Sequence, residues 1–198
     1  MTTTALLLLD LQNEMVDPAG KVGGGGLAAM AEQAKVLENA ARALAAARKA
    51  GIAVVHVRLA FQPGHVDCVS VAPRIAKLKE NNACVLGTWG AEFAPAVAPI
   101  YGELIVNKQC VNAFYNTGLL NWLMANGIKR VVMGGVATNL AVEAAVRAAD
   151  DAGLAPVVLS DCCASPNADW HRFSIENMIP VFGSVSTSVE FERSLAQA

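Results

Sequence analysis

The sequence has few charged residues and no excess of basic ones. Charged side chains make up 16% of its 198 residues, and the formal net charge is −2. Long disordered tails usually carry more charge than this. The basic surface that attracts nucleic acid or an anionic membrane is also missing. We therefore expect neither nucleic acid nor a membrane as a partner.

Long apolar runs and paired cysteines are missing too. Although 54% of the residues are hydrophobic, no apolar run reaches the roughly 18 residues of a spanning helix. The N-terminal apolar run stops at Asp10 and has no basic residue before it, so it predicts a buried strand rather than a signal peptide. The five cysteines form no C-x-x-C pair, which favours reduced thiols in the cytoplasm over zinc ribbons or disulfides.

The common cofactor and catalytic motifs are not found. The sequence contains no P-loop, no G-x-S-x-G and no H-E-x-x-H. Gly23–Gly26 follows no predicted strand and lacks the dinucleotide-binding spacing. His56 and His65 lack the spacing of metal ligands. We therefore expect no metal and no cofactor.

Strand-length apolar runs alternate with helical stretches along the chain. The predicted strands are 5–9, 53–58, 104–107, 130–133, 156–159 and 181–185, and the predicted helices are 27–50, 117–126, 138–152, 168–178 and 187–196. Continuous Val, Ile and Leu strands separated by helices indicate an α/β fold with a parallel sheet covered on both faces. With no composition break, we expect one domain over residues 1–198.

The segment 61–99 fits this alternation least well. Proline, glycine and asparagine are scattered through it, which indicates turns and loops. We interpret it as an excursion that covers the active face, with short helices near 71–78 and 91–97.

Three polar or glycine-rich features each follow a predicted strand. They are Asp10, Lys108 and the loop 134–141. In a parallel sheet, ligands bind beyond the carboxyl ends of the strands. We therefore expect these three features to share one rim.

Asp10 and Lys108 each have a functional and a structural interpretation. Asp10 can act as an acid or base in a pocket, or it can be a helix-cap or turn residue. Lys108 can orient Asp10 and hold it ionised, or bind an anionic substrate. Equally, its ammonium group can simply reach solvent.

The turn 134–138 leads from a predicted strand into a predicted helix. Thr138 can cap that helix, and the free N–H groups of its first turn can bind an anion, as in an oxyanion hole. The alternative is an ordinary strand-to-helix turn that uses two glycines. Ala141, just inside the helix, has no chemistry of its own and suits a packed helix.

Several other side chains are candidates for contacting a substrate. Arg58 can bind a substrate carboxylate, although structural pairing would also explain it. The full set is Gln12, Arg58, Trp89, Phe114 and Tyr115. Aromatic residues can line a pocket, but they are core residues by default.

Taken together, three segments resemble the isochorismatase-like (cysteine hydrolase) superfamily. They are LLLLDLQNEM (6–15), VNKQCVNAFYNTGL (106–119) and GGVATNLAVEAAVRAA (134–149). The resemblance implies a three-layer α/β/α domain, doubly wound around a six-stranded parallel sheet. It also implies a homodimer or homotetramer that acts on a small-molecule amide, urea or carbamoyl compound.

The resemblance also assigns roles to the site residues. It makes Asp10 the general base and Lys108 its partner, and it places a cis peptide at Val136–Ala137 that turns the N–H groups of Ala137 and Ala141 toward the substrate oxygen. The family's nucleophilic cysteine corresponds to Ala141. This alanine is either native to a cysteine-less member or an engineered replacement that traps a substrate.

The missing thiol leaves several functions open. A methyl group cannot attack a carbonyl, so a thioester at position 141 is excluded. Water activated by Asp10 can still hydrolyse an amide weakly. The alternatives are vinyl-ether hydrolysis of the isochorismatase type with Asp10 as the acid, Cys110 as a substitute nucleophile, and a catalytically silent relative that binds a small ligand.

Overall fold

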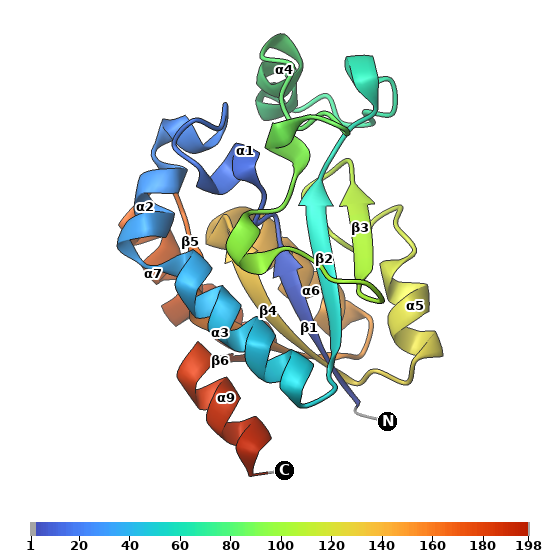
Figure 1. Cartoon of the computed structure of the whole chain (residues 1–198), viewed down its shortest axis with the longest axis vertical. Coiled ribbons are helices and arrows are strands. Elements are labelled where there is room, and N and C mark those ends of the chain that lie inside the picture. Colours follow the sequence, from blue (N-terminus) through green and yellow to red (C-terminus); the bar gives the residue numbers. More distant parts are fainter. Residues whose placement is uncertain (1–2, 198) are drawn as a thin grey trace.

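A parallel sheet of six strands forms the centre of the fold (Figure 1). The computed structural model describes residues 3–197. The strands are β1 (Thr4–Leu9), β2 (Ala53–Leu59), β3 (Leu104–Lys108), β4 (Arg130–Val136), β5 (Ala155–Ala164) and β6 (Ser184–Ser186). Their order across the sheet is β3-β2-β1-β4-β5-β6, and every neighbouring pair is parallel.

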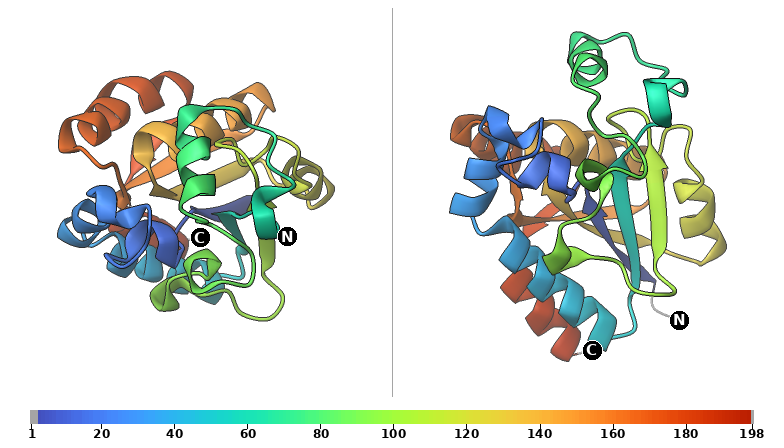
Figure 2. Two further views of the ribbon diagram at one scale, coloured as in Figure 1. Left: turned by 90° about the horizontal axis from the view of Figure 1, so that it is seen from above. Right: turned by 45° about the horizontal axis from the view of Figure 1, so that its top comes forward.

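Helices cover both faces of this sheet. The helices are α1 (Asn13–Val16), α2 (Leu27–Gln33), α3 (Val36–Lys49), α4 (Pro73–Glu80), α5 (Leu119–Ala125), α6 (Glu143–Asp151), α7 (Ala168–Phe173), α8 (Ile179–Phe182) and α9 (Ser188–Ala196). Figure 1 shows α3 and α9 in front of the sheet and α6 behind it, and the views in Figure 2 place the sheet between these layers. The predicted doubly wound three-layer α/β/α fold is therefore confirmed.

Two hydrophobic cores lie on opposite faces of the sheet because side chains alternate along each strand. In β1, Leu6 and Leu8 pack into the core that also contains Leu44 of α3. Leu7 and Leu9 pack into the other core, with Leu123 of α5. The uninterrupted leucine run of β1 is thus explained by burial on both faces.

Three predicted elements differ from the structure. The predicted helix 27–50 is two helices, because Lys35 has a left-handed backbone (φ 53°) between α2 and α3. The predicted strand 181–185 is wrong in its first half: α8 occupies that stretch, where Phe182 packs under the guanidinium of Arg147 at 4.4 Å from the ring centroid. The helix predicted near 91–97 is two short 3-10 turns, the second of which starts at Pro95, a residue with no N–H to continue a helix.

The excursion 61–99 extends beyond the carboxyl ends of the strands. In Figure 1, α4 stands above the ends of β1 and β2. Its position follows from Ile75, which is buried in the core below while the rest of the helix is largely exposed. Within residues 3–197, no helix has the length and apolar character needed to cross a membrane.

We predict that Gly135→Ala lowers the free energy of unfolding by about 3 kcal/mol or more in urea denaturation. Gly135 has φ 146°, and an added Cβ would overlap the carbonyl oxygen of Leu9 on the neighbouring strand. Gly153→Ala is the matched control, since Gly153 also has a positive φ (72°) but open space around it. We expect the control to lose only about 1–2 kcal/mol. Equal losses in the two variants would contradict the steric explanation.

Candidate active site

Asp10 and Lys108 meet at the carboxyl edge of the sheet, although their strands are not neighbours. Asp10 follows β1 directly, and Lys108 is the last residue of β3. β2 lies between them, and its last residue, Leu59, is in register with Lys108. The lysine side chain therefore reaches past the end of β2 to the aspartate.

The two side chains form a buried ion pair. Lys108 Nζ lies 2.7 Å from Asp10 Oδ2 and donates a second hydrogen bond to the carbonyl oxygen of Val111 at 2.9 Å. Asp10 is 5% exposed and Lys108 is 1% exposed. Among residues 3–197, Asp10 Oδ1 has no hydrogen-bond partner. One carboxylate oxygen is thus fixed by the lysine, and the other is left with free lone pairs.

The electrostatic balance at Asp10 has two opposing parts. Burial raises the pKa of Asp10 because it disfavours the charged carboxylate, whereas the Lys108 ammonium and the nearby backbone N–H of Leu59 lower it in part. The net direction is upward from the ordinary carboxyl value. A carboxylate whose pKa is shifted toward neutrality is a better general base or acid than an ordinary one.

The elbow between β4 and α6 faces the same space. The peptide bond Val136–Ala137 is cis, and a π-helical turn (Thr138–Val142) follows it. In such a turn each N–H donates to the carbonyl five residues earlier, so the N–H groups of the first residues lack partners within the turn. Leu140 N instead donates to the carbonyl of Ala137 at 3.0 Å.

Three hydrogen bonds hold this elbow against the segment after β5, and one of them runs from Ser165 Oγ to Asn139 Oδ1 at 2.9 Å. Thr138 Oγ1 lies 2.8 Å from His171 Nδ1, and Asn139 N donates to Ser165 Oγ at 3.3 Å. Thr138 was predicted to cap the helix, but the N-cap residue is Ala137 and Thr138 is the first residue of the turn. Its hydroxyl is engaged with His171 instead, which fixes the start of the turn.

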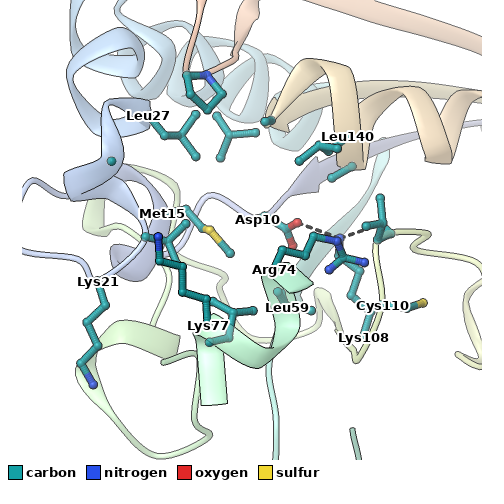
Figure 3. Close-up of a pocket in the computed structure, with 18 of the residues that line it drawn as sticks. Asp10, Met15, Lys21, Leu27, Leu59, Arg74, Lys77, Lys108, Cys110 and Leu140 are labelled. Carbon is teal, nitrogen blue, oxygen red and sulfur yellow. Dashed lines mark hydrogen bonds and ion pairs between the residues drawn. The ribbon is translucent and has the colours of Figure 1, made fainter. Parts of the chain in front are cut away.

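A pocket of about 330 Å³ joins these features (Figure 3). Its lining includes Asp10 and Lys108 together with Val136, Ala137 and Ala141 of the elbow. Apolar side chains form much of the wall, among them Met15, Leu27, Leu59 and Leu140. The predicted common rim of Asp10, Lys108 and the elbow is therefore present in the structure, and its volume suits a small molecule.

The other predicted substrate contacts are not among the residues that line this pocket. Gln12 is fully buried, where its amide donates to the carbonyl of Leu59 at 3.0 Å and accepts from Leu59 N at 3.0 Å. The Arg58 guanidinium is occupied by Asn107 Oδ1 and the carbonyl of Ala91, each at 2.7 Å. Both side chains hold the scaffold around the site.

The three aromatic candidates also lie elsewhere. Phe114 packs against the core on the α5 side of the sheet. Trp89 and Tyr115 are 48% and 62% exposed and do not line the pocket. They were candidates because large aromatic side chains often line pockets. None of the three lies in the wall of the pocket that contains Asp10.

Four pocket residues on α4 and at its C-cap were not predicted from the sequence. Arg74, Lys77, Leu78 and Asn81 all line the pocket. Their spacing was the available signal, because residues three, four and seven apart lie on one face of a helix. The segment 61–99 was predicted to cover the active face, but which of its side chains point into the pocket was not predicted.

Thiols and metal ligands contribute little to this pocket. Cys110 lines it, but its Sγ donates to the carbonyl of Asn112 at 3.3 Å and points away from Asp10 in Figure 3. Burial raises the pKa of Cys84 and Cys162, and it raises the pKa of Cys163 to about 12. Within residues 3–197, no group of three or more His, Cys, Asp or Glu side chains could hold a metal ion.

The chain belongs to the isochorismatase family, because the family model for the isochorismatase domain matches residues 4–190. It is 32% identical to maleamate amidohydrolase from Pseudomonas putida, over 92% of this chain and 82% of the relative. It is 30% identical to ureidoacrylate amidohydrolase RutB from Methylobacterium radiotolerans, over 98% of this chain and 80% of the relative.

Solved structures show the same fold. An isochorismatase family protein from Desulfovibrio vulgaris superimposes with a TM-score of 0.86 at 24% identity. The match covers 99% of this chain and 100% of that protein. The order and layering of the elements are thus those of the family.

We predict that Lys108→Met lowers the free energy of unfolding at pH 8 by about 3–5 kcal/mol, because it leaves the Asp10 charge buried and unpaired. Without the ammonium the folded-state pKa of Asp10 rises further above its unfolded value. Stability is then retained while Asp10 is protonated and lost as the pH rises through that pKa. The deficit should therefore shrink at pH 4.5.

Urea denaturation at pH 4.5 and pH 8 measures this difference, with Lys79→Met on the exposed side of α4 as the control. A deficit in Lys108→Met that is the same at both pH values would show that the loss comes from packing rather than from charge.

Proposed function

We propose that this protein hydrolyses a C–N bond in a small amide, urea or carbamoyl compound, with Asp10 as general base and water as the nucleophile. The observation that carries the proposal is the unpartnered Oδ1 of Asp10, buried beside Lys108 in a pocket that faces Ala141. The named relatives that cleave maleamate and ureidoacrylate support the same class of reaction.

In this mechanism Asp10 takes a proton from a water molecule in the pocket, and the water oxygen attacks the carbonyl carbon. Lys108 keeps Asp10 ionised before the attack, because its ammonium favours the carboxylate. The proton held on Oδ1 then passes to the departing nitrogen as the C–N bond breaks. The products are a carboxylic or carbamic acid and ammonia or an amine.

The elbow supplies the second part of the proposed mechanism. The N–H groups of Ala137 and Ala141 would donate to the oxygen that becomes negative in the tetrahedral intermediate. Both residues line the pocket, and the first turn of a π helix has N–H groups without partners inside the turn. Removing one such donor typically costs about 2.7–4 kcal/mol in the transition state.

Ala141 limits the reaction to this non-covalent route. Its side chain is 4% exposed and has no atom that could form a thioester. The covalent intermediate that a cysteine would form is therefore absent from the proposal, and rates should be modest.

The assembly and location predicted from the sequence, a homodimer or homotetramer in the cytoplasm, stay predictions.

We predict that kcat/KM for a panel of amides and ureas falls at least about 100-fold in Asp10→Asn, the low end of what general bases contribute. In the unaltered protein, kcat/KM should rise with pH through the pKa of Asp10, because the base must be ionised. That rise should lie above the ordinary carboxyl value of about 3.9, since burial raises the pKa of Asp10.

The pH profile also separates the two chemical alternatives. If Asp10 acts as an acid on a vinyl ether, the rate should instead fall as the pH rises through the same pKa. Equal rates in the unaltered protein and Asp10→Asn would contradict both hydrolase proposals and leave a ligand-binding role.

We predict that Ala141→Cys raises amide hydrolysis at least about 100-fold, because it places a thiol at the elbow beside the Asp10–Lys108 pair. The new activity should be lost on alkylation with iodoacetamide. The double variant Asp10→Asn/Ala141→Cys is the control, and its rate should stay near the low rate of Asp10→Asn because neither the thiol nor a water molecule then has a base. Full activation without Asp10 would argue against its role as the base.

A further inference from the structure

The helix α4 presents a cationic face to the candidate active site. Ile75 anchors the helix in the core, and Pro73 begins it. Arg74, Lys77 and Asn81 then lie along one side at helical spacing and line the pocket. Figure 3 shows Arg74 and Lys77 reaching from α4 into the space in front of Asp10 and Met15.

The charges that line the pocket are unbalanced. Four cationic side chains, Lys21, Arg74, Lys77 and Lys108, contribute to its wall, against the single carboxylate of Asp10. Lys108 is already paired with Asp10 at 2.7 Å. A pocket of this composition attracts an anion.

Two of these cations remain available. Lys21 Nζ donates to the carbonyl of Asn82 at 2.8 Å and points away from the pocket centre in Figure 3. Arg74 and Lys77, by contrast, form no ion pair with any residue between 3 and 197. A guanidinium can hold both oxygens of a carboxylate at once, and a neighbouring ammonium adds a second positive charge.

The pocket walls strengthen this attraction. Met15, Leu27 and Leu59 contribute apolar surface around the cations. Charges beside apolar walls are less screened than charges in open water, so the field inside the pocket is stronger than at a flat surface.

We infer that Arg74, assisted by Lys77, binds a carboxylate group on the substrate, at the opposite end of the molecule from the scissile carbonyl. The substrate class is then an amide or urea that carries its own carboxylate, such as a monoamide of a short dicarboxylic acid. This inference rests on the proposed function for the position of the scissile bond, but the anion site itself does not require any hydrolysis.

The first experiment measures binding without chemistry. Isothermal titration calorimetry with maleate, a dicarboxylate that has no amide to cleave, compares the unaltered protein with the double variant Arg74→Gln/Lys77→Gln. We expect the affinity to fall about tenfold or more, which is the size of one lost charge-assisted hydrogen bond. Lys79→Gln is the matched control, because Lys79 is a cation of the same helix that does not line the pocket.

The second experiment measures selectivity in turnover. Maleamate and its methyl ester carry the same amide, but only maleamate has the free carboxylate. In the double variant we expect KM for maleamate to rise about tenfold with kcat little changed, and the kinetics of the ester to stay the same. Lys79→Gln should match the unaltered protein with both compounds.

The two experiments separate this inference from the proposed function. Loss of maleate affinity in the double variant, with no turnover of either amide by any form, would support the anion site and contradict the hydrolase. Turnover of both amides with no change in the double variant would support the hydrolase and overturn the anion site. Failure of the unaltered protein to bind maleate would also overturn the anion site.

Discussion

The candidate site depends on one interaction, the buried ion pair between Asp10 and Lys108. The two residues are 98 positions apart in the sequence and come from strands that do not touch. Two buried charges are costly unless each satisfies the other, so the pair fixes the relative position of the ends of β1 and β3. Among residues 3–197 it also leaves one oxygen of the Asp10 carboxylate without a hydrogen-bond partner, at a pocket that is also lined by the elbow after β4.

Two polar side chains that were predicted from the sequence to contact the substrate instead hold the scaffold around the ion pair. Gln12 connects the turn after β1 to the end of β2 through Leu59. Arg58 connects β2 to Asn107 of β3 and to the excursion at Ala91. The type and approximate position of these residues made them candidates, but only the folded structure shows that both side chains make hydrogen bonds to the scaffold.

The strands were predictable because continuous apolar runs such as Leu6–Leu9 are typical of parallel strands that are buried on both faces of a sheet. The ends of those strands then placed Asp10, Lys108 and the elbow on one edge. The break at Lys35 was not predictable, since neither glycine nor proline marks it and the helix propensity of its neighbours is high. The orientation of Arg74 was not predictable either, because it depends on how Ile75 docks α4 onto the core. The identity of residue 141 is plain in the sequence, and the structure adds that Ala141 lines the pocket.

The central claim is that Asp10 is an ionised base at neutral pH whose charge is maintained by Lys108. The most direct measurement is a ¹³C NMR titration of the Asp10 carboxyl carbon in the unaltered protein, assigned with Asp10→Asn. We expect a pKa above the ordinary carboxyl value, with the group ionised at pH 7. A titration at or below the ordinary value, or a carboxyl that is still protonated at pH 7, would contradict the account.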